Sequence, residues 1–179
     1  MNRCFFVVLA GVLMGLAGYG FAAESKSFNV NMVNADRKEV GKATLTETPN
    51  GVLVQVQLRE KPPGISAGTH AIHIHEVGKC EPPFKSAGGH FNPLGKKHGF
   101  LDKQGKHVGD LPNIHVPQNG SLTVEFLAPQ LTLSGGKASL LDSDGSSLVI
   151  HAGADDYRTD PAGDSGDRVA CGVIEKQSK

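Results

Sequence analysis

Apolar residues recur at every second position in several short runs of this chain, and this alternation restricts its fold more than any other feature. In residues 28–33 and 122–126, apolar and polar side chains alternate as in strands with one buried face. Residues 53–58, 148–151 and 169–175 are further short apolar-rich runs. No stretch keeps an apolar period of 3.6 residues, so the pattern predicts an all-β sandwich or barrel of about seven or eight strands. Two dipeptides are typical of hairpin turns: Asn50-Gly51 and Asn119-Gly120.

Two long segments, residues 77–112 and 152–168, interrupt the strand pattern. They are rich in Gly and Pro, with Lys and His in the first and Asp in the second. Loops of this length are uncommon inside a compact domain and are usually functional or disordered. The chain shows no repeats and no second domain, so residues 23–179 are expected to form one domain.

Residues 1–22 have the features of a secretory signal peptide. Arg3 precedes an apolar run from Phe5 to Leu16, and Gly20 and Ala22 are small residues before a cut after Ala22. The run is shorter than the ~20 apolar residues that a membrane span needs, although an uncleaved anchor is an alternative. We therefore expect export, most naturally to a Gram-negative periplasm, with no membrane association after cleavage.

The charge and cysteine content agree with an exported protein. Removing residues 1–22 removes Arg3 and no acidic residue, which leaves a net charge near −1. This balance excludes the basic excess that is typical of nucleic-acid binding. Cys4 belongs to the signal, so Cys80 and Cys171 remain as a pair. In an oxidising compartment we expect them to form one disulfide that closes a loop of about 90 residues.

The segment HAIHIHEVGKC, residues 70–80, contains a pair of histidines in strand alternation. His73 and His75 would face one side of a strand, about 6.5–7 Å apart, and Ile72 and Ile74 the other. The two imidazoles could bind one metal ion or form an exposed polar face. His151 ends an apolar strand and, taken alone, is more often a satisfied core histidine than a ligand.

The first long loop carries a second set of candidate ligands: His90, His98, His107 and Asp110. Imidazole and carboxylate suit a closed tetrahedral zinc site, and zinc would also order a loop that is rich in Gly and Pro. A solvated loop with scattered histidines is an equally good interpretation of these residues alone. Of the two remaining histidines, His70 is expected to be structural and His115 to be a solvated strand residue.

Six sequence blocks together resemble one family, the copper,zinc superoxide dismutases, most closely the secreted bacterial periplasmic group. They occur in the family's order and spacing over the whole mature chain. The blocks are residues 70–76 (HAIHIHE), 86–93 (SAGGHFNP), 97–99 (KHG), 107–112 (HVGDLP), 151–156 (HAGADD) and 168–174 (RVACGVI).

The resemblance implies an eight-stranded flattened Greek-key β-barrel, an immunoglobulin-like sandwich with two long loops. It implies dismutation of superoxide to dioxygen and hydrogen peroxide, by alternate reduction and oxidation of a histidine-bound copper ion. One copper and one zinc are expected per subunit, and a homodimer is one assembly that the resemblance allows. The copper ligands that it implies are His73, His75, His90 and His151. The zinc ligands that it implies are His90, His98, His107 and Asp110.

The resemblance also assigns roles around the metals. His90 would bridge the two ions as an imidazolate and carry a proton during turnover. Asp155 would link a copper-bound and a zinc-bound histidine, as carboxylates beside metal ligands do. Arg168 would offer a planar set of donors to the anion beside the copper. The disulfide between Cys80 and Cys171 would tie the metal loop to the last strand.

Two other functions compete with the interpretation as a dismutase. A protein that buffers copper or zinc could use the same fold, and a zinc hydrolase would need an open coordination position.

The charge of the second long loop departs from the family: residues 155–167 carry five Asp residues and one basic residue, Arg158. We therefore hypothesise that the metal loop steers the anion with its lysines: Lys79, Lys85, Lys96, Lys97, Lys103 and Lys106.

Overall fold

The computed structural model describes residues 26–176, so the predicted signal at residues 1–22 lies outside the described part of the chain. The elements are β1 (Ser27–Asn34), β2 (Glu39–Thr48), β3 (Gly51–Leu58), β4 (Gly68–His70), β5 (Ile72–His75), the 3₁₀ turn η1 (Lys85–Ala87), β6 (Ile114–Val116), β7 (Leu122–Ala128), β8 (Ser146–His151) and β9 (Arg168–Ile174). The all-β prediction is confirmed. Within this described range, helical structure is too short to provide an apolar membrane-spanning helix.

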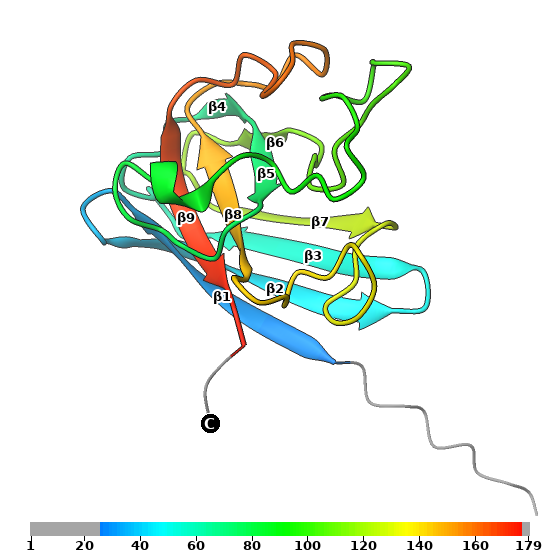
Figure 1. The fold of residues 1–179 in the computed structure, drawn as a ribbon. Helices are drawn as coiled ribbons and strands as arrows, with labels where there is room; N and C mark the ends of the chain where they lie inside the picture. Colours follow the sequence, from blue (N-terminus) through cyan, green and yellow to red (C-terminus); the bar gives the residue numbers. More distant parts are fainter. Residues whose placement is uncertain (1–25, 177–179) are drawn as a thin grey trace, which may run out of the picture.

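The strands form one curled antiparallel sheet and one small sheet. Seven strands are hydrogen-bonded in the order β5-β8-β9-β1-β2-β3-β7, and β4 pairs with β6. The pairs β5-β8, β9-β1 and β3-β7 are not consecutive in sequence, so the chain crosses over between strands, as it does in Greek-key folds. In Figure 1 the sheet curls so that β9, β8 and β5 stand over β1, β2 and β3. The Greek-key barrel that the resemblance implies therefore fits this structure.

The expected number of strands agrees with the structure once β4 and β5 are taken together. Only Ala71 separates them. Its N–H donates to the carbonyl of Gly153 (2.7 Å) and its carbonyl accepts from the N–H of His151 (2.9 Å). As one interrupted strand, β4 and β5 occupy a single place, so the nine assigned strands fill the eight expected places.

Two details of the strand pattern differ from expectation. The sequence pattern did not predict β2, because Val40 and Gly41 are both buried and break its alternation. Asn50-Gly51 closes a tight hairpin in which Thr48 pairs with Gly51, as predicted. Asn119-Gly120 also forms a turn, but the strands on either side do not pair with each other: β6 pairs with β4, and β7 pairs with β3. The second hairpin prediction is therefore wrong.

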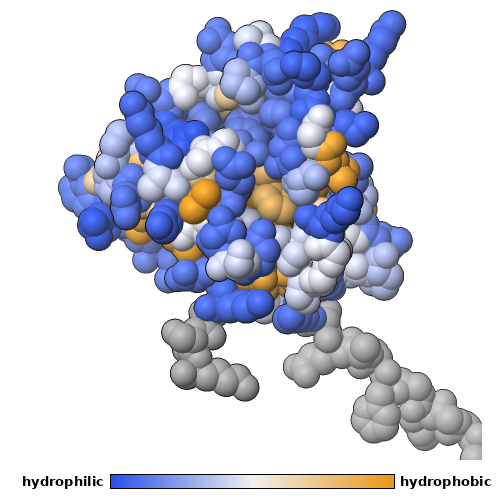
Figure 2. All heavy atoms as spheres, viewed as in Figure 1, coloured by the Kyte–Doolittle hydropathy of each residue, from blue (hydrophilic) through white to orange (hydrophobic). Residues whose placement is uncertain are grey.

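The core lies between the two halves of the curled sheet. Its largest fully buried side chains include Met32, Leu45, Ile72, Ile74 and Leu148. Each such burial contributes about 1.5–3 kcal/mol relative to an exposed side chain. The surface in Figure 2 is mostly polar, with apolar side chains in separate spots. The hydrophobic effect thus fixes the barrel, and the barrel carries the two loops.

A smaller apolar cluster on the opposite face of β8 and β9 anchors the metal loop. Phe84 and Ala87 pack there against Val149 of β8 and Cys171 of β9. This second layer explains why every residue of β8 is buried. The segment around η1 is thereby pressed against β8 and β9.

The loop 152–167 and the later part of the loop 77–112 lie beyond the same end of the barrel (Figure 1). Residues 77–112 contain one short helical turn, and residues 152–167 contain no strand. The prediction that both segments are long loops is confirmed. Their ends meet β5 and β8, the strands that carry His73, His75 and His151.

Candidate metal centre

The free edge of β5 places the first long loop over the histidine pair. Ile74 donates its N–H to Gly109 (2.9 Å) and accepts from the N–H of Phe91 (2.8 Å). Isolated bridges pair His75 with His90 and His73 with Asp110. An edge strand has unsatisfied backbone groups, and here two segments of the metal loop satisfy them. His90 and Asp110 are carried to the site by this pairing.

A first group of four histidines converges at the junction of β5, β8 and the loop. All four are buried, with exposed fractions of 7% or less, and each offers a ring nitrogen within 4.8 Å of the others. The rings of His73 and His75 lie 6.5 Å apart on one face of β5, while Ile72 and Ile74 join the core. The predicted alternation is confirmed, and the alternative of an exposed polar face is wrong. The group consists of His73, His75, His90 and His151.

The hydrogen bonds of these rings determine which nitrogen is available. The Nδ1 of His75 donates to the carbonyl of Gly88 (3.0 Å), and that of His151 lies 3.2 Å from the carbonyl of Gly166. In a neutral imidazole the other nitrogen then carries a lone pair. The two Nε2 atoms face each other at 3.4 Å. A shared proton or a metal ion between these two atoms would satisfy both of them.

The other two histidines present unpartnered nitrogens to the same place. His73 Nδ1 and His90 Nε2 are buried and have no hydrogen-bond partner among residues 26–176. An unpaired buried polar atom normally costs about 1–3 kcal/mol. A metal ion would engage both atoms, which is the role that the sequence blocks predict for them.

A second group of ligands adjoins the first and shares His90. It consists of His90, His98, His107 and Asp110. Asp110 Oδ1 lies 2.8 Å from His90 Nδ1 and 3.4 Å from His107 Nδ1. Its other oxygen is held by the N–H groups of Gly99 and His107, both at 3.0 Å. His90 therefore turns Nδ1 toward one group and Nε2 toward the other.

Asp155 joins the two groups through one carboxylate. Its Oδ2 accepts from His73 Nε2 and its Oδ1 from His98 Nε2, both at 2.9 Å. These bonds leave Nδ1 of each ring as the atom available to a metal. A carboxylate that orients a ligating imidazole in this way also raises its basicity. The structure thus brings Asp155 to the position that the resemblance implied.

Burial controls the charge of the first group. Burial, together with the nearby histidines and Arg168, lowers the pKa of His75 to about 2. For the same reasons the pKa of His151 falls to about 3, and burial lowers that of His90 to about 4 despite its bond to Asp110. These rings are neutral near pH 7, and neutral imidazole is the form that binds metals.

The second group contains an ionised carboxylate that stabilises positive charge on the imidazole beside it. Burial favours the neutral carboxyl of Asp110, but bonds from His107, His90 and His98 outweigh it and hold its pKa well below the usual range. Burial also opposes protonation of His98, yet bonds to Asp110 and Asp155 raise its pKa to about 9. This half of the centre therefore attracts positive charge.

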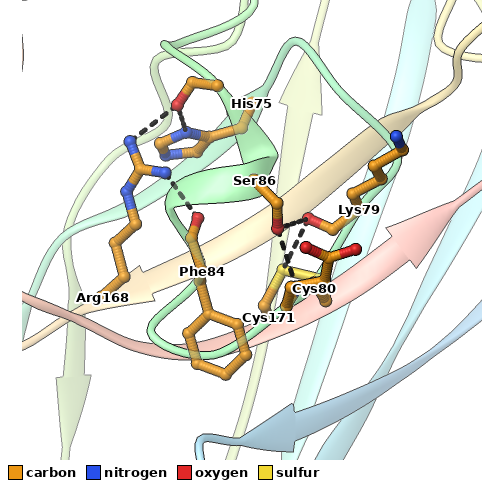
Figure 3. The surroundings of a disulfide bond; sticks show 9 residues. His75, Lys79, Cys80, Phe84, Ser86, Arg168 and Cys171 are labelled. Atoms are coloured by element: carbon orange, nitrogen blue, oxygen red, sulfur yellow. Dashed lines mark hydrogen bonds between the residues drawn. A yellow bond between two sulfur atoms is a disulfide. The ribbon is translucent and has the colours of Figure 1, made fainter.

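Arg168 lies beside the first group and is held by the loop around η1. Its Nη1 and Nη2 donate to the carbonyls of Phe84 (2.6 Å) and Gly88 (2.7 Å). Figure 3 shows the guanidinium beside the ring of His75, which donates to the same Gly88 carbonyl. A hollow of about 470 Å³ opens here, lined by Arg168, His90 and His151 among others. A small anion can enter it and meet the arginine.

The donor geometry fits the metals that the sequence predicted. A tetrahedral ion at about 2.0–2.1 Å from its nitrogen ligands separates them by about 3.3–3.4 Å. In the second group, His90 Nδ1 and His107 Nδ1 lie 3.5 Å apart, close to this separation. Imidazole alone suits copper in both oxidation states, and imidazole with carboxylate suits zinc.

The remaining histidines are structural or exposed, as expected. Both ring nitrogens of the buried His70 contact carbonyl oxygens, those of His151 (2.8 Å) and Ser66 (3.0 Å). His115 is exposed on β6. Cys80 and Cys171 form the predicted disulfide. Sequence reasoning missed Asn113, which bonds to the backbone of Asp155, because nothing in the local pattern marks it.

The barrel and its adjoining ligand groups define a β-barrel protein with two candidate metal-binding groups that share one histidine. The family model for copper/zinc superoxide dismutase matches residues 39–174. Superoxide dismutase [Cu-Zn] 1 of Aquifex aeolicus is 48% identical over 162 residues, which cover 89% of this chain and 94% of that protein. This chain therefore belongs to the copper/zinc superoxide dismutase family, oxidoreductases that act on superoxide with copper and zinc.

Solved structures agree with the family assignment. A SOD-like protein from Bacillus subtilis is 42% identical, with a TM-score of 0.75 over 82% of this chain and 97% of that one. The Cu/Zn superoxide dismutase from Brucella abortus is 32% identical, with a TM-score of 0.67 over 84% of this chain and all of that one. The overall fold is thus shared with these experimentally determined structures.

Proposed function

We propose that the two ligand groups divide the metals between them and that superoxide is dismutated at the copper side. Copper would be held by His73, His75, His90 and His151. Zinc would be held by His90, His98, His107 and Asp110. The observation that supports this division most directly is the set of buried ring nitrogens that lack a protein partner or face one another. Bound copper supplies the electron exchange with superoxide.

The chain's own groups would bind the anion and move a proton. Two N–H groups of Arg168 are bound to carbonyls, which fixes the plane of the guanidinium. Arg168 lines the hollow, so its other donors would be available to an anion there. His90 Nε2 has no partner among the described residues, so it can take up a proton and deliver it to the reduced product. Zinc and Asp110 would hold His90 in place meanwhile.

The test is superoxide consumption by mature protein loaded with copper and zinc, compared with His151→Ala. We expect the variant to lose copper and keep zinc, because His151 belongs to the copper group only. Its rate of superoxide consumption should fall at least a hundredfold. His115→Ala is a matched control, since His115 is exposed on β6 and belongs to neither ligand group. A wild-type protein that binds both metals without consuming superoxide would overturn the proposal and favour the metal-buffering function.

A zinc hydrolase is disfavoured by the second group itself. Four protein atoms surround the proposed zinc position, and hydrolysis needs an open coordination position for water. The first group contains no carboxylate that could act as a general base. The geometry therefore favours redox chemistry.

We further propose that residues 1–22 direct export. The mature chain, residues 23–179, would then remove superoxide in the periplasm. The disulfide between Cys80 and Cys171 supports an oxidising compartment. The mass of protein recovered from the periplasm tests this, because cleavage after Ala22 leaves a chain that starts at Ala23.

The proposed centre uses residues of one chain only, so a homodimer would not alter its ligands. Sedimentation of the mature protein tests whether that homodimer forms.

A further inference from the structure

Asn113 lies between the proposed zinc ligand Asp110 and β6 in the sequence, and its side chain hydrogen-bonds to the backbone of Asp155. Its Nδ2 donates to the carbonyl of Asp155 and its Oδ1 accepts from the N–H of Asp155, both at 2.9 Å. Both backbone groups of Asp155 are thus satisfied by one amide from a segment 42 residues away. Such a two-sided contact fixes position and orientation together.

Asp155 needs this support because no strand holds it. It lies in the loop between β8 and β9, four residues after His151, yet it is 3% exposed. Its carboxylate must reach His73 and His98 at the same time. A small shift of the backbone would lengthen at least one of these bonds.

Tyr157 reinforces the same contact from the other side. Its hydroxyl accepts from the backbone N–H of Asn113, and its own N–H donates to Asp155 Oδ1, both at 2.7 Å. Its carbonyl accepts from the N–H of Leu101 in the metal loop (3.0 Å). Asn113 is therefore the point where the segment after Asp110 is joined to the loop that carries Asp155.

We propose that Asn113 is a positioning residue of the metal centre. It holds Asp155 where the two carboxylate oxygens orient one imidazole of each ligand group, and it thereby raises the affinity for zinc through His98. This inference rests on the proposed ligand assignment. It assigns a role to a residue that touches neither metal position.

The first test is the dissociation constant for zinc, measured by chelator competition on the mature protein. Loss of carboxylates beside metal ligands typically weakens binding 10–100-fold, and we expect Asn113→Ala to weaken zinc binding on the order of tenfold. Asn34→Ala is the matched control. Asn34 also bonds two backbone segments, Pro63 (3.3 Å) and Lys38 (2.9 Å), but contacts no proposed ligand. Unchanged zinc affinity in Asn113→Ala, or equal weakening in both variants, overturns the proposal.

A second test separates positioning from general stability. If Asn113 acts through Asp155, Asn113→Ala should cause no further loss of zinc affinity in an Asp155→Asn background. Two effects that add in full would contradict the proposal. If Asn113→Ala does not fold, Tyr157→Phe removes only the hydroxyl that Asn113 contacts, and we expect a two- to threefold weakening; no weakening would overturn the proposal.

The outcome can be separated from that of the proposed function. His98→Ala should abolish tight zinc binding if the ligand assignment is right. If it does so while Asn113→Ala changes nothing, only the role of Asn113 is wrong. If His98→Ala leaves zinc affinity intact, the ligand assignment itself is wrong.

Discussion

At the scale of the residue, the centre depends on which nitrogen of each histidine is occupied by the protein. The carbonyl of Gly88 bonds to Nδ1 of His75, Gly166 and the Ser165 hydroxyl contact Nδ1 of His151, and Asp155 bonds to Nε2 of His73 and His98. Each bond fixes a tautomer and directs the remaining lone pair. A histidine placed here without its partner would present the wrong atom or rotate.

Gly163 shows how little room the linking carboxylate has. Its φ is 66°, and a Cβ there would overlap Asp155 Oδ1 and lie 2.7 Å from His98 Nε2. We expect Gly163→Ala to weaken zinc binding at least tenfold, because the bond between Asp155 and His98 must break. Chelator competition measures it.

Gly136→Ala is the control for Gly163→Ala. Gly136 has a similar φ of 75°, but a Cβ there would meet nothing within 4 Å. Both variants share the backbone strain, and only Gly163→Ala adds the collision. Equal zinc affinities in the two variants would contradict the expected steric effect.

At the scale of the element, the disulfide joins the metal loop to β9. Cys80 follows β5 at the start of the loop, and Cys171 lies in the middle of β9, 91 residues later. Between Cys80 and His90 the chain supplies the Phe84 and Gly88 carbonyls that hold Arg168 (Figure 3). The covalent link and the apolar cluster under η1 therefore hold the same short segment.

Replacing Cys80 by serine should lower the free energy of unfolding by about 2–5 kcal/mol, because the unfolded chain regains the freedom of a long loop. Urea unfolding of metal-free protein measures this change. A thiol reductant should destabilise the wild type by a similar amount and leave Cys80→Ser unaffected. A variant as stable as the oxidised wild type would show that the link contributes nothing.

At the scale of the whole molecule, the contacts of the six lysines of the metal loop decide which of them could steer the anion. Lys97 is paired with Asp160 at 2.9 Å, and Lys106 donates to the carbonyls of His107 and Asp110. These two lysines are already engaged. Lys85 is exposed and lines, together with Arg168 and with Asp36 and Asp167, a hollow of about 600 Å³. Of the six lysines, Lys85 is thus the best placed to attract an anion toward Arg168.

We expect Lys85→Gln to lower kcat/KM for superoxide about two- to threefold at low ionic strength, since an exposed charge focuses the approach of an anion. The difference should fade above ~0.1 M salt, where the Debye length falls to ~10 Å. Lys137→Gln is the control, because Lys137 is exposed on the loop between β7 and β8. Identical salt dependence in both variants would refute steering by Lys85.

Much of the fold could be predicted because strand alternation is a local property. The runs that became β1, β3 and β7 show their buried face as alternation in their own sequence, and those that became β8 and β9 are recognisable as short apolar-rich runs. The strand β2 could not be predicted, because Val40 and Gly41 are both buried. The hairpin at Asn119-Gly120 was predicted wrongly, because turn chemistry specifies a reversal of the chain and not the partner strand.

The sequence by itself determined the residue types of the centre, their order and the strand face on which His73 and His75 lie. Only the tertiary structure decided that His90 and Asp110 meet β5 along its free edge, and that Asp155 reaches both ligand groups with the support of Asn113. The physical reason is the separation along the chain over which each interaction acts. Alternation acts between neighbours in the chain, whereas the partners that orient each imidazole come from segments up to 82 residues away.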